Sequence, residues 1–294
     1  MKVEAECAAC LLSRGIAEAK EATDNPALHF RAAAEIVNLL KREFKPSAVP
    51  AVLGTKRDRI IRRVTGCSDP YRRTKQICNQ NALKMLPYAR KLVEEGYRLY
   101  DRFRRACLCS IVGNIMEFDI PGHNFTFSKM KKLLLEAGED LAVDDIPRIY
   151  ELAEKSKSVL LLADNAGEIV FDTLLVEQLK SIGLSVYVAV KGGPVINDAT
   201  MEDAEASNMV EIADKVITTG TDAVGLILEE ASPEFLSIYA SVDLVIAKGM
   251  GYAETLTEYK LNKPHALLFR TKCEPVANFF GVFRDRNVAK LMMP

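Results

Sequence analysis

Oxygen-bearing side chains follow two apolar runs in the C-terminal half of the 294-residue chain. Asp164 and Asn165 come directly after the first run, and Asp198 lies in the segment after the second. Carboxylate and amide oxygens are hard ligands, which suit Mg²⁺, Mn²⁺ or a similar divalent cation better than a soft metal. The sequence therefore predicts a divalent-metal site with Asp164, Asn165 and Asp198 as ligands.

Lysines and a glycine follow apolar runs in the same half of the chain. Lys191, Lys248 and Lys272 would bring compact positive charge to phosphate oxygens, and Gly249 would let the backbone approach them closely. Together with a metal, this set suits phosphate-ester hydrolysis, because the metal would polarise the phosphoryl group and Lys248 would stabilise its charge. The nucleophile is either a metal-activated water or Asp164 itself, and the sequence leaves both open.

Each of these residues also has a purely structural interpretation. Asp164 with Gly167 is typical of a helix-capping turn, and glycines after a strand often serve only the turn. The functional interpretation is favoured because four expected strand ends carry such residues together.

Five short apolar runs position these residues, and they alternate with helical stretches after residue 156. This alternation predicts β-α units in an open, doubly wound sheet, in which ligands gather at the carboxyl ends of the strands. The expected strands are Val159–Ala163, Leu184–Val190, Lys215–Thr219, Asp243–Ala247 and Ala266–Phe269.

The preceding residues show helical spacing of apolar side chains from Val3 to about Lys157, which predicts six or seven helices. We therefore expect an α/β protein of two domains. Residues 1–155 would form an all-α helical domain, and residues 156–294 a Rossmann-like domain with a doubly wound, mostly parallel sheet.

Composition excludes several classes of protein. With 39 basic and 40 acidic residues the net charge is −1, which argues against general nucleic-acid binding. No uncharged stretch approaches the roughly 18 residues that cross a membrane. Glu4 and Glu6 stand where a signal peptide would be basic, so a cytoplasmic protein is expected.

Seven cysteines, an odd number in a long chain, suggest reduced thiols. Cys7 and Cys10 are either half of a thiolate metal site or buried structural thiols. Further thiolate ligands would then come from Cys67, Cys78, Cys107 or Cys109. The three histidines show no metal-binding spacing and receive no role.

Six motifs are spread over most of the chain. They are DPYRRTK with Asn79 (69–79), VGNIMEF (112–118), DNAGE (164–168), KGGPVINDAT (191–200), DLVIAKGMG with Glu254 (243–254) and KCEPVA (272–277). In this order they resemble the damage-control phosphatase family, which comprises metal-dependent phosphatases formerly classed as a domain of unknown function. The pair Cys7 and Cys10 resembles the cysteine-bearing prokaryotic branch of that family.

The resemblance implies an active site in the cleft between a helical and a Rossmann-like domain. It also implies that Asp164, Asn165 and Asp198 bind the divalent metal, which in the family is often cobalt, nickel or magnesium. Lys248 and Glu254 would belong to the substrate and phosphate site. From the helical side, the residues facing the cleft would be Asp69, Lys75 and Asn114.

Two departures from the family pattern concern the substrate contacts. The chain has Gly251-Tyr252-Ala253-Glu254 where the family usually has Gly-Asn-Tyr-Glu, and Glu117 where an aspartate is common. The metal ligands are therefore better supported than the substrate contacts.

The expected function is that of a phosphatase acting on a small phosphorylated metabolite, such as a sugar phosphate, a nucleotide or a damaged cofactor precursor. One alternative is an S-adenosylmethionine-dependent carboxyl methyltransferase, although DNAGE lacks the glycine-rich turn that such an enzyme would want. Another is a non-catalytic sensor of phosphorylated ligands. The substrate, the preferred metal and the oligomeric state stay open.

Overall fold

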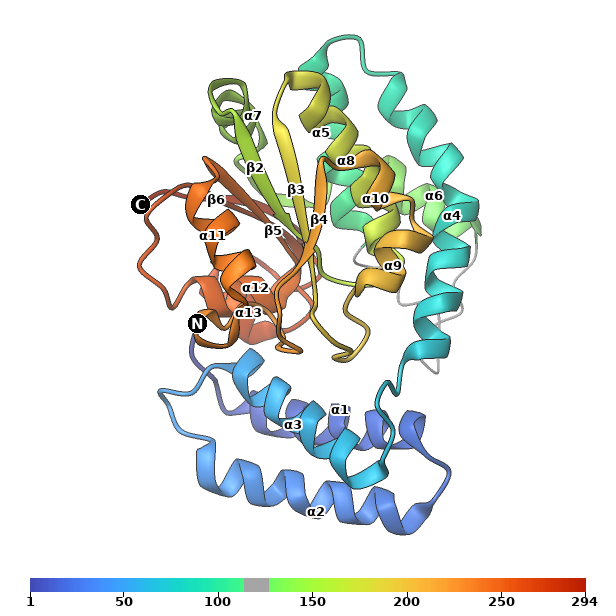
Figure 1. Ribbon diagram of the computed structural model, residues 1–294, viewed down its shortest axis with the longest axis vertical. Coiled ribbons are helices and arrows are strands. Elements are labelled where there is room, and N and C mark those ends of the chain that lie inside the picture. Colours follow the sequence, from blue (N-terminus) through green and yellow to red (C-terminus); the bar gives the residue numbers. More distant parts are fainter. Residues whose placement is uncertain (114–126) are drawn as a thin grey trace.

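Seven strands in the described part of the chain form one sheet in the computed structural model, which describes residues 1–113 and 127–294 (Figure 1). The strand order is β1-β7-β6-β5-β2-β3-β4, and every neighbouring pair is parallel except β6 with β7. The mostly parallel α/β prediction is confirmed. The strands are β1 (Leu141–Asp144), β2 (Ser158–Leu162), β3 (Ser185–Val190), β4 (Lys215–Thr218), β5 (Leu244–Lys248), β6 (His265–Arg270) and β7 (Asn287–Met292).

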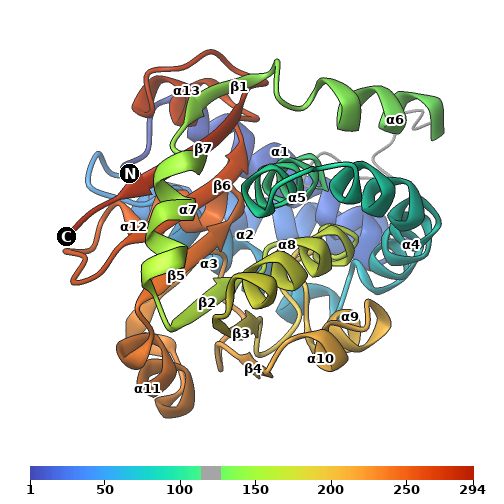
Figure 2. The same ribbon diagram turned by 90° about the horizontal axis from the view of Figure 1, so that it is seen from above.

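Helices cover both faces of the sheet and extend beyond it (Figure 2). Proline at the first helical position and a polar residue before it start two of them, because Asn25 caps the Ala27 amide and Ser232 caps the Phe235 amide. The helices before β1 are α1 (Glu6–Ala22), α2 (Pro26–Glu43), α3 (Pro50–Thr65), α4 (Arg72–Glu94), α5 (Leu99–Gly113) and α6 (Phe127–Glu136). Those after it are α7 (Ile146–Lys155), α8 (Glu168–Ile182), α9 (Met201–Ala206), α10 (Met209–Ile212), the 3-10 turn η1 (Leu228–Glu230), α11 (Pro233–Ser241), α12 (Gly249–Leu256) and α13 (Glu274–Phe279).

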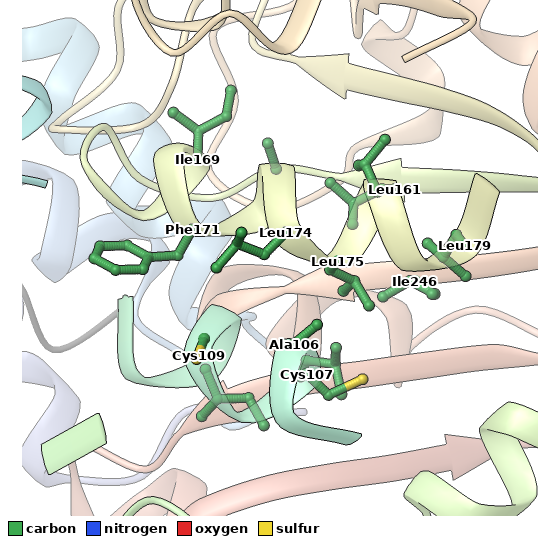
Figure 3. Close-up of a cluster of buried hydrophobic side chains, with 14 of the residues drawn as sticks. Ala106, Cys107, Cys109, Leu161, Ile169, Phe171, Leu174, Leu175, Leu179 and Ile246 are labelled. Carbon is green, nitrogen blue, oxygen red and sulfur yellow. The ribbon is translucent and has the colours of Figure 1, made fainter. Parts of the chain in front are cut away.

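The sheet is buried on both faces, with one apolar cluster on each. In β2 the side chains alternate, so that Val159 and Leu161 join the cluster under α5 and α8, while Leu160 and Leu162 join the cluster under α11 and α12. Figure 3 shows the first cluster, in which Leu174 and Leu175 of α8 pack between the sheet and α5. This two-sided burial explains the continuous apolar runs in the sequence.

A separate layer of three helices, α1 to α3, lies beneath the carboxyl ends of the strands (Figure 1). Polar contacts fasten it to the loops there: Asp58 of α3 accepts a hydrogen bond from the Ile196 amide at 3.0 Å, and Thr55 accepts one from the Val224 amide at 2.9 Å. Arg59 also pairs with Asp222 at 2.5 Å. The long helix α4 runs from this layer along the side of the sheet (Figure 1).

The structure differs from the expected all-helical segment 1–155 in one respect, the strand β1. It pairs in parallel with β7, another strand that the sequence analysis did not predict. Both form at the sheet edge from segments about 146 positions apart in the chain, as in the pair Leu141 and Asn287. Local apolar patterning carries no information on such a pairing.

None of the helices in the described residues is both long enough and apolar enough to cross a membrane.

Candidate active site

The candidate site lies at the carboxyl ends of β2 and β5, the neighbouring strands at which the strand order reverses. β2 lies between β3 and β5, so the connections after β2 and after β5 leave neighbouring strand ends and run to opposite sides. Such a switch point at the carboxyl ends of parallel strands opens a crevice for a ligand. Asp164 and Asn165 lie in the loop after β2, whereas β5 is followed directly by α12, whose first residue is Gly249.

Two loop segments bring the three predicted metal ligands together. Asn165 and Asp198 face each other in an isolated antiparallel β-bridge. The Ala199 amide donates to the Asp164 carbonyl at 2.7 Å, and the Ala166 amide donates to the Asn197 carbonyl at 2.9 Å. Asp164, Asn165 and Asp198 are therefore neighbours, although 33 positions separate Asn165 from Asp198 in the sequence.

Gly249 allows the Asp164 side chain to lie where it does. The residue has φ +79°, and a β-carbon on it would overlap the Asp164 carboxylate. Glycine is thus required both by the backbone conformation and by the close approach of that carboxylate.

The site concentrates negative charge away from water. Burial, followed by the charges of Glu168 and Asp198, raises the pKa of Asp164 well above its usual range, although Lys272 and Lys191 oppose the shift. Burial also raises the pKa of Asp198 to about 6 against the opposing effect of Lys191. A bound cation would lower the pKa values of both carboxyl groups, because it favours their charged forms.

One oxygen of this set is unsatisfied. Asp198 Oδ2 is buried and has no hydrogen-bond partner among the described residues, while Lys191 Nζ lies 3.5 Å from it. A buried polar atom without a partner is unfavourable unless a ligand completes its environment. The carboxylates of Asp164 and Asp198, the latter including this oxygen, and the amide of Asn165 form a hard-donor set that fits a divalent cation.

The buried ammonium groups of Lys191 and Lys248 interact with acceptors inside the protein. Lys191 donates to the Gly225 carbonyl at 2.7 Å and the Tyr252 hydroxyl at 3.1 Å. Lys248 contacts Glu168 at 2.5 Å and Asp172 at 2.9 Å. Burial opposes the charge on Lys248, but these two carboxylates outweigh it and raise the pKa of Lys248.

The helical side contributes Lys75 and Asp69. Lys75 lies in α4, where its Nζ contacts Asp203 Oδ2 at 2.9 Å, Thr200 Oγ1 at 3.3 Å and Asp69 Oδ2 at 3.8 Å. Burial raises the pKa of Asp69. Asn114, the third predicted residue on this side, lies outside the described residues, as does Glu117.

A cavity of about 240 Å³ opens between the layer of α1 and α3 and the strand ends. Glu254 and Lys272, two of the predicted substrate contacts, line it, and so does Ile196, whose φ of +47° is strained for a branched side chain. Burial raises the pKa of Glu254 to about 7, while the amino group of Met1 and Arg14 oppose the shift. The apolar part of the lining includes Leu11, Pro50, Ala51, Val224, Met250 and Pro275.

Three cysteines also line this cavity: Cys7, Cys10 and Cys273. The other predicted thiolate ligands, Cys67, Cys78, Cys107 and Cys109, do not line it. Cys107 and Cys109 are buried in the core beside α8 (Figure 3). Within residues 1–113 and 127–294, no three side chains of histidine, cysteine, aspartate or glutamate are placed to share a metal ion. The candidate metal site therefore depends on the amide of Asn165 as well as on two carboxylates.

Sequence reasoning missed two residues that hold the loop of Asp164 and Asn165, of which only Glu168 contacts a predicted ligand directly. Glu168, fully buried at the start of α8, accepts hydrogen bonds from the side chain and the backbone of Asn165. Asn79 of α4 accepts one from the Gly167 amide at 2.7 Å. Both belong to motifs that the sequence analysis quoted, so the signal was present, but no local pattern showed what these side chains contact.

A family model for the damage-control phosphatase ARMT1-like domain matches residues 3–288. An uncharacterized protein of Methanocaldococcus jannaschii is 38% identical, with 98% of this chain and 95% of the relative covered. A damage-control phosphatase of Archaeoglobus fulgidus is 37% identical, with 99% and 100% covered. The crystal structure of a DUF89 family protein from Pyrococcus horikoshii superposes with a TM-score of 0.86 at 30% identity, covering 98% of each chain.

Proposed function

The chain belongs to the damage-control phosphatase family, which makes it a phosphatase, and we propose that it hydrolyses small phosphorylated metabolites with the help of a divalent cation. The observation that supports the metal dependence is the buried Asp198 Oδ2 beside Asp164 and Asn165, which accepts no hydrogen bond from the described residues and has only the 3.5 Å ion pair with Lys191. Mg²⁺, Mn²⁺, Co²⁺ and Ni²⁺ are the candidate ions.

A cation held by Asp164, Asn165 and Asp198 would withdraw charge from the phosphoryl group. Other residues of the chain would position the metal ligands and the phosphoryl group. Lys191 supports the Asp198 carboxylate from the interior of the protein, with Nζ 3.5 Å from Oδ2. We assign Lys272, which lines the cavity, to the phosphoryl oxygens. The absence of a side chain on Gly249 lets the Asp164 carboxylate lie against the backbone there.

The rest of the substrate would occupy the cavity under α1 and α3. Its volume of about 240 Å³ fits a small metabolite rather than a polymer. Because Glu254 keeps a proton up to about neutral pH, its carboxyl can donate a hydrogen bond to an oxygen of the substrate. Ester and water together yield an alcohol and inorganic phosphate.

The test is release of inorganic phosphate from sugar phosphates, nucleotides and phosphorylated cofactor precursors. Metal-stripped protein would be assayed with Mg²⁺, Mn²⁺, Co²⁺ or Ni²⁺ restored separately. We expect metal-dependent release that falls at least about 100-fold in Asp164→Asn. Asp214→Asn is the control, because Asp214 directly precedes β4 at the other end of the strand and forms an exposed ion pair with Lys180. It should retain activity within about threefold.

Two other outcomes would contradict the proposal. Binding of S-adenosylmethionine with methyl transfer and without phosphate release would indicate the methyltransferase. Binding of phosphate esters without turnover under any of the four metals would indicate the sensor.

A further inference from the structure

Lys248 has no hydrogen-bond donor left for a substrate. Its side chain is fully buried, and Nζ donates to Glu168 Oε1 at 2.5 Å, Asp172 Oδ1 at 2.9 Å and the Ser110 carbonyl at 3.1 Å. An ammonium group has three N–H donors, and here each has an acceptor inside the protein. Contact with a phosphoryl oxygen would require Lys248 to leave one of these acceptors.

Glu168 connects this cluster to the metal-ligand loop. While Oε1 accepts from Lys248, Oε2 accepts from Asn165 Nδ2 at 3.2 Å and from the Asn165 backbone amide at 3.4 Å. The Glu168 side chain is fully buried, so the contacts of its two oxygens hold it in one orientation.

The side-chain amide of Asn165 has two possible orientations, which exchange its oxygen and its nitrogen. In the structure both N–H groups of Nδ2 face carboxylates, namely Asp164 Oδ2 at 2.7 Å and Glu168 Oε2 at 3.2 Å. A bound cation would keep Asp164 ionised, and an ionised carboxylate accepts hydrogen bonds and offers none. The reversed orientation would then place an oxygen against two acceptors. The carbonyl oxygen Oδ1 therefore faces away from both.

We propose that Glu168 is a positioning residue, held in place by Lys248, which fixes the Asn165 amide so that its oxygen rather than its nitrogen faces the cation. This inference rests on the proposed function, because it concerns the same metal site. It assigns Lys248 a role that acts through Glu168 instead of a direct contact with phosphate. Partners that orient a metal ligand in this way commonly matter almost as much as the ligand.

Asp172 provides a matched control inside the same cluster. It is as deeply buried as Glu168 and shares Lys248, but its other hydrogen bond comes from Ser110 Oγ at 2.6 Å. Asp172→Asn and Glu168→Gln each remove one charge from the surroundings of Lys248. Of the two substitutions, Glu168→Gln alone changes a side chain that contacts Asn165.

The experiment measures Mn²⁺ affinity of the full chain by titration calorimetry, with thermal unfolding in EDTA to verify folding. Glu168→Gln should weaken Mn²⁺ binding roughly 10- to 100-fold, because glutamine can hydrogen-bond either orientation of Asn165. Asp172→Asn should stay within about threefold. Should Glu168→Gln not fold, Glu168→Asp keeps the charge but is too short to reach Asn165, and the same loss is expected.

A second background separates orientation from general damage. In Asn165→Asp both terminal atoms are oxygens, so the orientation no longer matters, and one of them faces Glu168 Oε2. Glu168→Gln would then relieve a repulsion between carboxylates and should no longer weaken Mn²⁺ binding. Equal losses in both backgrounds, or in Glu168→Gln and Asp172→Asn alike, would overturn the inference. Wild-type affinity in Glu168→Gln would overturn it while leaving the proposed function intact. A wild-type chain that binds none of the four metals would overturn both.

Discussion

Asn79 Oδ1 accepts a hydrogen bond from the Gly167 amide at 2.7 Å, and this contact ties helix α4 to the loop that begins with Asp164. The other end of the same amide, Nδ2, donates to Asp203 Oδ1 at 2.8 Å. Asp203 Oδ2 in turn accepts from the Thr200 amide at 2.8 Å, next to the segment that carries Asp198. One buried side chain of the helical part thus holds both segments that supply the predicted metal ligands.

Asn79→Ala should therefore destabilise the protein and weaken metal binding together. The substitution leaves the buried Gly167 amide without its acceptor and removes the Asn79 donor from Asp203, which costs on the order of 1–3 kcal/mol. Chemical denaturation of the metal-free protein measures the first effect, and Mn²⁺ titration measures the second. Asn81→Ala in the same helix is the control, since Asn81 makes an exposed contact with Lys84 at 3.4 Å. If both variants behave alike, Asn79 does not hold the loops.

Gly249→Ala is expected to displace the Asp164 carboxylate and so disturb the metal site. An alanine would have to adopt the left-handed conformation of Gly249, and its methyl group would displace the Asp164 carboxylate. Gly183→Ala isolates the first effect, because Gly183 has φ +109° and no atom lies within 4 Å of an added β-carbon. We expect a loss of roughly 1 kcal/mol for Gly183→Ala, and a larger loss with impaired Mn²⁺ binding for Gly249→Ala. Unimpaired Mn²⁺ binding in Gly249→Ala would show that Asp164 is not confined by this contact.

The raised pKa of Glu254 predicts that the free energy of unfolding depends measurably on pH. Its pKa is raised from 4.5 to about 7 in the folded protein, mainly by burial, so the folded state holds a proton that the unfolded state releases near pH 4.5. The stability of the metal-free protein should thus fall as pH rises from about 4.5 to 7. With allowance for the partial exposure of Glu254, the loss should reach about 2 kcal/mol by pH 8.

Glu254→Gln removes this titration. Relative to wild type, the variant should have nearly the same free energy of unfolding at pH 5 and a value about 2 kcal/mol higher at pH 8. Urea denaturation of both proteins at several pH values measures the difference. Curves that run parallel across this range would mean that Glu254 titrates as an ordinary exposed carboxyl.

The sequence was sufficient for five adjacent strands of the sheet, β6, β5, β2, β3 and β4, and for the rim on which the ligands lie. Asp164 follows a buried run closely and Asp198 lies in the segment after the next run, and a parallel sheet brings the ends of such runs together. It was not sufficient for the partners of Lys248. The position after a strand suggests an open lysine, but Glu168 and Asp172 lie on the face of α8 that meets α5 and the sheet, and only tertiary packing reveals that face.

The strands β1 and β7 were missed for a different reason. β1 has four residues and alternates between half-buried and exposed positions, so its local pattern is too short to stand out. β7 runs antiparallel to β6, the one antiparallel pair in the described sheet, and its other partner β1 precedes the first predicted strand. Pairings over such separations depend on the rest of the fold being in place.

The pairing of β1 with β7 bears on how this protein can be divided. A fragment begun at residue 156 would contain Asp164, Asp198 and Gly249, yet it would lack β1 and leave β7 without its neighbour on that side. A bare edge of this kind is a template for pairing with a second molecule, which favours self-association. The α/β half is therefore not an autonomous module, because its outermost strand is supplied by residues that precede the sequence boundary between the two halves.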